Sequence, residues 1–180
     1  MLYTQYIASD GRYLYIPQPT SNRIARVGPN YKSAGAPVSF FTDFGGAAAP
    51  QTPTGIAYDG RFLWVTLSGQ GLLLQLDPAS PFLQSVQVKE CLSGNNVSQA
   101  VAWDGDSLWA TCPGANLAFA GLGRVDPEKT LSSGNGMLGA FVGFNGATEL
   151  RVRPTPGGSR LYILSTGDNT VRMLTNEPLH

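Results

Sequence analysis

The feature that constrains this chain most is a segment that recurs four times along its 180 residues. Each copy has a short apolar run, a glycine-containing turn, and a second run that begins with leucine followed by an aromatic residue. The aligned glycines are Gly11, Gly60, Gly105 and Gly158, which gives spacings of 49, 45 and 53 residues. A period of this size is typical of a repeat architecture, in which each unit packs on its neighbours.

Three copies carry Asp-Gly in the turn, at Asp10, Asp59 and Asp104. Asp-Gly between apolar runs predicts a tight β-hairpin, because glycine tolerates the positive φ that such a turn requires. The leucine and aromatic pairs that follow are Leu14-Tyr15, Leu63-Trp64, Leu108-Trp109 and Leu161-Tyr162. We expect the four leucines to occupy equivalent buried positions and the aromatic residues to pack between repeats.

A third apolar run follows at 23–27, 72–76, 121–125 and 170–174, and a fourth at 38–42, 83–88 and 138–142. Four strands per unit of 45 to 50 residues predict an all-β propeller of about four blades. We expect one domain over residues 1–180, with blades at approximately 1–50, 51–98, 99–147 and 148–180. A β-sandwich also has many short strands, but it does not explain the fixed period.

The fourth repeat has only three predicted strands, and only five residues precede the first strand of the chain. Two arrangements therefore stay open. One is a closed four-bladed ring in which residues 2–5 supply the last strand. The other is an open arc, completed by other chains, whose two apolar end faces would be covered by self-association or by a protein partner.

Composition excludes several classes of protein. The 12 Lys and Arg residues balance the 12 Asp and Glu residues, so the chain has no excess of positive charge to attract phosphate groups, and we expect no nucleic-acid partner. The first residues do not resemble a signal peptide and no apolar stretch is long enough to span a membrane, so we expect no membrane insertion and a cytoplasmic or virion location. Cys91 and Cys112 are expected to be reduced thiols, although a bridge between them stays open.

The run Ile-Ala-Tyr-Asp-Gly-Arg-Phe-Leu-Trp-Val at 56–65, followed by Gln-Leu-Asp-Pro at 75–78, resembles blades of the propeller group that includes the NHL, YVTN and gluconolactonase-like families. The resemblance extends over all four repeats. It implies the propeller fold, whereas the group's functions include lactonases, lyases, adhesive surface proteins and scaffolds. Its lyases are expected to use a histidine base, and its lactonases to hold a divalent cation with Glu, Asn and Asp oxygens.

The only histidine is His180, the last residue, and the turn aspartates are expected to bond their own backbone. The sequence therefore predicts no catalytic residue, no metal site and no cofactor. Polar loops between the second and third strands are candidate sites for a sugar, a peptide or a protein, although ordinary turn composition also explains them. The candidate binding residues are Ser21, Asn22, Ser68, Gln70, Asn116, Asp168 and Asn169.

We therefore expect a non-catalytic binding or scaffold module that acts as a subunit of a larger assembly. A structural or receptor-recognising component of a virion tail or fibre is a special case, with a carbohydrate or cell-surface receptor as a further partner. Two alternatives stay open: a metal-dependent hydrolase of the lactonase kind, and a fragment of a longer surface or enzymatic propeller.

Overall fold

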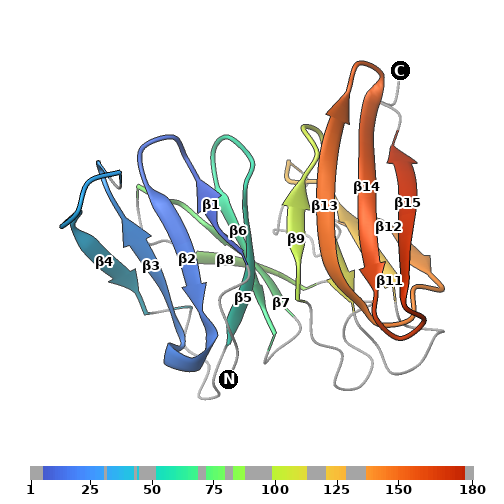
Figure 1. The fold of residues 1–180 in the computed structure, drawn as a ribbon, viewed down its shortest axis with the longest axis horizontal. Coiled ribbons are helices and arrows are strands. Elements are labelled where there is room, and N and C mark those ends of the chain that lie inside the picture. The colour runs from blue at the N-terminus through green and yellow to red at the C-terminus, as the bar shows by residue number, and fades with distance from the viewer. Residues whose placement is uncertain are drawn as a thin grey trace.

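The computed structural model describes residues 6–30, 32–42, 44, 52–68, 72–79, 83–87, 99–112, 121–128 and 137–176. These residues form β-strands and a single 3-10 turn at Pro19–Ser21, with no α-helix among them. The strands make four antiparallel sheets, one for each repeat (Figure 1). The prediction of an all-β fold built from four blades is confirmed.

Each sheet is assembled from strands in their order along the chain. The first sheet contains β1 (Ala8–Ser9), β2 (Leu14–Gln18), β3 (Arg23–Val27) and β4 (Val38–Phe41). The second contains β5 (Pro53–Tyr58), β6 (Leu63–Leu67), β7 (Leu72–Leu76) and β8 (Leu83–Gln87). The third contains β9 (Val101–Trp103), β10 (Leu108–Cys112), β11 (Gly121–Val125) and β12 (Met137–Val142). The fourth has three strands, β13 (Ala147–Thr155), β14 (Gly158–Ser165) and β15 (Thr170–Asn176).

The predicted Asp-Gly turns join the first two strands of the first three sheets. Gly11, Gly60 and Gly105 have φ values of +87°, +100° and +102°, in the region that favours glycine. Figure 1 shows the hairpins of the first, second and fourth sheets at the same, upper end of the molecule. The hairpins therefore set a common orientation for successive blades.

Each leucine and aromatic pair places one side chain on each face of its sheet, because neighbouring residues of a strand point to opposite sides. Trp64 packs in a cluster with Val101 and Leu108 of the third sheet, whereas Leu63 packs in the cluster that contains Tyr15 of the first. We call the side that carries the aromatic residue the forward face, and the side that carries the leucine the backward face. Each interface between blades thus joins a forward face to the backward face of the next sheet.

One of the four repeat leucines is less buried than the sequence predicted. Leu63, Leu108 and Leu161 are completely buried, but Leu14 is only half-buried. Leu14 nevertheless occupies the same position in its sheet as Leu63, since Leu14 pairs with Val27 as Leu63 pairs with Leu76. The expectation was wrong for Leu14 because no described blade lies against the backward face of the first sheet.

The described strands form four sheets in an arc that does not close into a ring. The first sheet lies at the left of Figure 1 and the fourth at the right, and the extensive contacts between described strands run only between consecutive sheets. Just before β1, the Tyr6 hydroxyl donates a hydrogen bond to the Thr148 carbonyl oxygen of β13 at 3.2 Å. This bond holds the inner edges of the first and fourth sheets together without covering their outward faces.

None of the helical segments in the described part of the chain is long and apolar enough to cross a membrane. Residues 2–5, which the closed-ring alternative needed as a strand, lie outside the described residues.

Candidate functional site

The turn aspartates, which could have formed a ring of carboxylates, are used within their own hairpins. Backbone NH groups of Arg61 and Phe62 donate to Asp59 Oδ1 at 2.7 and 2.6 Å, and Trp64 Nε1 donates to Oδ2 at 2.7 Å. Asp10 repeats the arrangement with the Tyr15 hydroxyl at 2.8 Å. The expectation that these carboxylates bond local backbone is confirmed, and the bond to the aromatic residue five positions later is an addition that sequence reasoning missed.

Asp104 makes the same local bonds and also joins two blades. Its Oδ2 accepts from Trp109 Nε1 at 2.7 Å, from Asn176 Nδ2 at 2.7 Å and from Ser159 Oγ at 3.2 Å. Partial burial raises the pKa of Asp104, but the hydrogen bonds, led by the Ser107 backbone NH, outweigh it and leave the pKa below its usual value. The carboxylate is therefore a charged structural link between the third and fourth sheets.

The run Asp104-Gly105-Asp106 is similar to the start of a calcium-binding loop, but its carboxylates have other partners in the described residues. Asp106 Oδ2 lies 3.0 Å from Arg124 Nη2 in an ion pair, while Asp104 already accepts the bonds given above. No group of three or more His, Cys, Asp or Glu side chains in the described ranges is placed to hold a metal ion.

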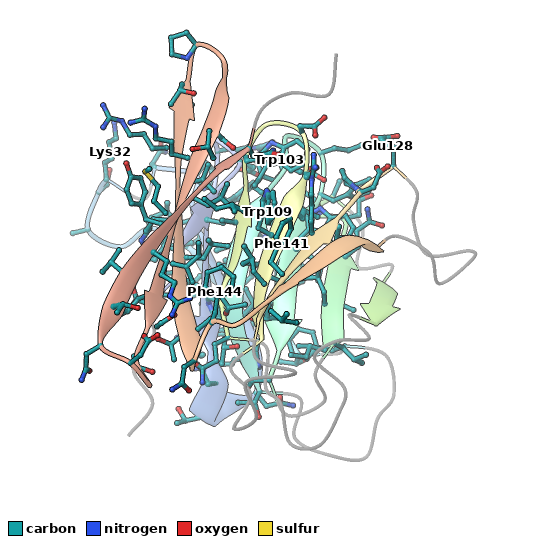
Figure 2. The ribbon with its side chains drawn as sticks, turned by 90° about the vertical axis from the view of Figure 1, so that its right-hand side faces the viewer. Lys32, Trp103, Trp109, Glu128, Phe141 and Phe144 are labelled. Atoms are coloured by element: carbon teal, nitrogen blue, oxygen red, sulfur yellow. The ribbon has the colours of Figure 1, made fainter. Side chains whose placement is uncertain are left out.

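The aromatic residues of the repeat serve packing, as expected. Tyr15, Trp64 and Trp109 are at most 1% exposed. Figure 2 shows Trp109 beside Phe141, and the two ring centroids are 5.6 Å apart. Tyr162 differs, because it is only half-buried on the forward face of the fourth sheet.

Two of the predicted binding residues instead secure a loop junction. Asn22 Oδ1 accepts a hydrogen bond from the Thr52 backbone NH at 2.9 Å, and buried Ser68 Oγ donates to the Thr52 carbonyl oxygen at 3.1 Å. These bonds connect the loop after β2 and the end of β6 to the start of β5. Asn22 and Ser68 therefore have a structural role, whatever else their loops contact.

The remaining predicted binding residues are placed separately. Ser21 and Asn169 are exposed. Asp168 lies in the β14–β15 loop, where Thr170 Oγ1 and Arg172 Nη2 each donate to it at 2.7 Å and, the Thr170 bond first, lower its pKa. Gln70 and Asn116 lie outside the described residues, as do Cys91 and the side chain of Cys112. The binding role of these loops, and the reduced state of the two cysteines, stay predictions.

A cavity of about 410 Å³ lies among the innermost strands of all four sheets. Residues 6 and 7, which directly precede β1, and the strands β5, β9 and β13 contribute side chains to it. Its wall is largely aliphatic, with Trp103, Tyr6 and the guanidinium of Arg151 as the aromatic and charged members. The sequence did not indicate this cavity, because it depends on how four distant strands converge.

Tyr6 and Arg151 sit together at this cavity, with the guanidinium carbon 5.3 Å from the ring centroid. Burial, and then the charge of Glu149, raise the pKa of Tyr6 to about 12, although Arg151 partly opposes this. The Tyr6 hydroxyl is therefore a neutral hydrogen-bond donor over the physiological pH range and not a base.

The outward faces of the two terminal sheets carry exposed apolar side chains. On the forward face of the fourth sheet, Val171 is 68% and Met173 is 57% exposed. On the backward face of the first sheet, Val38 is 52% and Phe40 is 45% exposed. Exposed apolar side chains of this size are the feature of the described surface that most resembles an interaction site.

No protein-family model and no curated protein matches the chain by sequence. Solved structures do match by shape. Hydrazine synthase of Kuenenia stuttgartiensis superimposes with a TM-score of 0.69 at 14% identity, covering 96% of this chain and 46% of that one. A chain of a nidogen/laminin complex gives 0.69 at 15% identity, covering 94% and 59%. A streptogramin B lyase gives 0.64 at 12% identity, covering 98% and 55%.

These matched proteins are β-propellers, and they include enzymes as well as a protein solved in complex with another protein. The chain spans about half the length of each of the three. At this level of identity the similarity establishes the fold alone. The chain is therefore a β-propeller protein whose described part provides four consecutive blades in an open arc.

Proposed function

We propose that this chain is a non-catalytic interaction module that joins a larger assembly through the outward faces of its first and fourth blades. The observation that carries the proposal is the contrast between equivalent positions. Leu63 and Leu76 on the backward face of the second sheet are completely buried by the first sheet. The equivalent residues Leu14 and Val27 are only half-buried, because none of the described strands lies against that face of the first sheet.

The same contrast exists at the other end of the arc. Trp64 and Gln75 form a cross-strand pair that is at most 5% exposed, whereas the equivalent residue pair Tyr162 and Met173 reaches 57% exposure at Met173. Burial of an apolar side chain stabilises an interface by about 1.5 to 3 kcal/mol. Both faces therefore have a strong tendency to acquire a partner.

The hairpin carboxylates support a structural and not a chemical role for the recurring Asp-Gly turn, since Asp10, Asp59 and Asp104 already accept bonds from backbone and aromatic donors. A symmetric particle, such as a virion tail or fibre, is one setting that would use a module of this kind.

The test is light scattering of the isolated chain combined with binding of an apolar dye. We expect either dye binding at the exposed faces or a mass above 19.1 kDa. A monomer that binds no dye would contradict the proposal. Turnover of a lactone that requires a divalent ion, and that a single Asp or Glu substitution abolishes, would also contradict it and would favour the lactonase alternative.

A further inference from the structure

We propose that the partner of these faces is a second copy of this chain, and that the forward face of the fourth blade in each copy packs on the backward face of the first blade in the other. This inference rests on the proposed function, since it names the occupant of the same two faces. The product is a ring of eight blades with two-fold symmetry, at the upper end of the usual range for propellers.

The support comes from the polarity of the repeat. Within the chain, each of the three interfaces joins a forward face with a buried aromatic residue to a backward face with a buried leucine. The two exposed faces are one of each kind: Tyr162 marks a forward face and Leu14 marks a backward face. They are the two halves of an interface that the chain already forms three times.

The register of the strands shows that these halves are built like the others. Leu14 pairs with Val27, in the place of Leu63 with Leu76 and of Leu108 with Val125. The latter two pairs are completely buried. A backward face of this kind is therefore complementary to a forward face and not to a second backward face.

The forward face of the fourth blade carries cross-strand pairs at the positions equivalent to those of the buried forward faces. Tyr162 pairs with Met173, and Leu164 pairs with Val171 in the adjacent row. Arg151 occupies the inner-strand position beside Tyr162, where the other three sheets have alanine at Ala8, Ala57 and Ala102. The same face also carries Glu149, which pairs with Leu164, and Arg153 and Arg160, which pair with each other, so its apolar side chains lie among charged ones.

The test uses three matched Val→Glu variants at exposed strand positions. Val171→Glu places a carboxylate on the forward face of the fourth blade, and Val38→Glu places one on the backward face of the first blade. Val142→Glu is the control, because Val142 is 62% exposed but lies on β12 in the third sheet, away from both faces. Circular dichroism checks that each variant keeps the β-fold.

We expect native mass spectrometry and light scattering to give a dimer of twice 19.1 kDa for the unsubstituted chain and for Val142→Glu. Val171→Glu and Val38→Glu should each weaken dimerisation about 100-fold or more, since an unpaired carboxylate would be buried at both interfaces of the ring. Mixing these two variants should recover part of the dimer, because one of its two interfaces then has neither substitution.

Other outcomes overturn the inference. A dimer lost in only one of the two face variants would mean that a face pairs with itself. Assemblies that grow without a limit would mean that the interface does not close. A monomer that binds apolar dye would mean that the faces take another partner, such as blades of a different or longer polypeptide, and the proposed function would stand. A monomer that binds no dye would remove both.

Discussion

Replacing Asp104 by alanine tests whether the hairpin carboxylate links two blades. Asp104 accepts five hydrogen bonds: two from the backbone NH groups of Asp106 and Ser107, and three from the side chains of Trp109, Ser159 and Asn176. A hydrogen bond to a charged group contributes about 1.5 to 3 kcal/mol, and such contributions are not additive within one network.

The largest part of the cost comes from Trp109. Trp109 is only 1% exposed, so water cannot replace the carboxylate as the acceptor of its indole NH. Leaving a buried donor without a partner costs about 1 to 3 kcal/mol. Because the other donors are partly exposed and can bind water, we expect Asp104→Ala to lower the free energy of unfolding by about 3 to 5 kcal/mol.

Urea unfolding followed by tryptophan fluorescence measures this change. The matched control is Asp106→Ala, which removes an ion pair with Arg124 whose aspartate side chain is 65% exposed, and which should cost no more than about 1 kcal/mol. A double-mutant cycle between Asp104→Ala and Trp109→Phe isolates the bond to the indole. If the two aspartate variants were equally stable, the assignment of Asp104 as an interblade link would be refuted.

Three further predictions follow from the same structure. Measured in the monomeric Val171→Glu background, Leu63→Ala should cost about 2 to 5 kcal/mol, whereas Leu14→Ala on the uncovered face should cost clearly less. Equal losses in thermal unfolding would contradict the face assignment. Gly55→Ala should destabilise the fold by about 1 to 3 kcal/mol, because a Cβ would lie 2.6 Å from the Gln99 carbonyl oxygen, while Gly157→Ala, which meets no atom within 4 Å, should leave the midpoint of urea unfolding unchanged. Because the pKa of Asp104 is lowered by folding, the stabilisation that its charge supplies is present above pH 3.8 and is lost as the pH falls further. In an acid titration of the free energy of unfolding, Asp104→Asn should therefore lose less stability than the unsubstituted chain. Identical acid curves for the two proteins would argue against a charged carboxylate in the folded state.

The sequence predicted the strands well because the signals for them are local. The third runs expected at 23–27, 72–76 and 121–125 coincide with β3, β7 and β11. Alternation, turn residues and proline act within a few positions, so one repeat is enough to read them. The bond from each turn aspartate to the aromatic residue was also within reach, because the spacing of five residues recurs at Asp10, Asp59 and Asp104.

Burial and the axial cavity depend on distant residues, and these were the parts that the sequence could not predict. Leu14 has the same local pattern as Leu63, yet its exposure depends on a neighbour that the repeat does not encode. Tyr6 lies 142 positions from Thr148, and no pattern in either segment indicates that their strands converge. The placement of Arg151 at the cavity follows from that convergence and was likewise not predictable.

The short reach of the aspartate–aromatic bond has a consequence for the order in which the chain folds. Each such bond joins residues only five positions apart, so the entropy lost on closure is small and the hairpin can form without help from the rest of the chain. The ring of Trp64 or Trp109 is then already oriented when the next repeat emerges during synthesis. The next blade can then pack directly against this oriented ring, so folding is expected to propagate from the amino terminus, one repeat at a time. The fourth hairpin has Gly157 in the place of the aspartate, so it lacks this local bond and should be the last to become ordered.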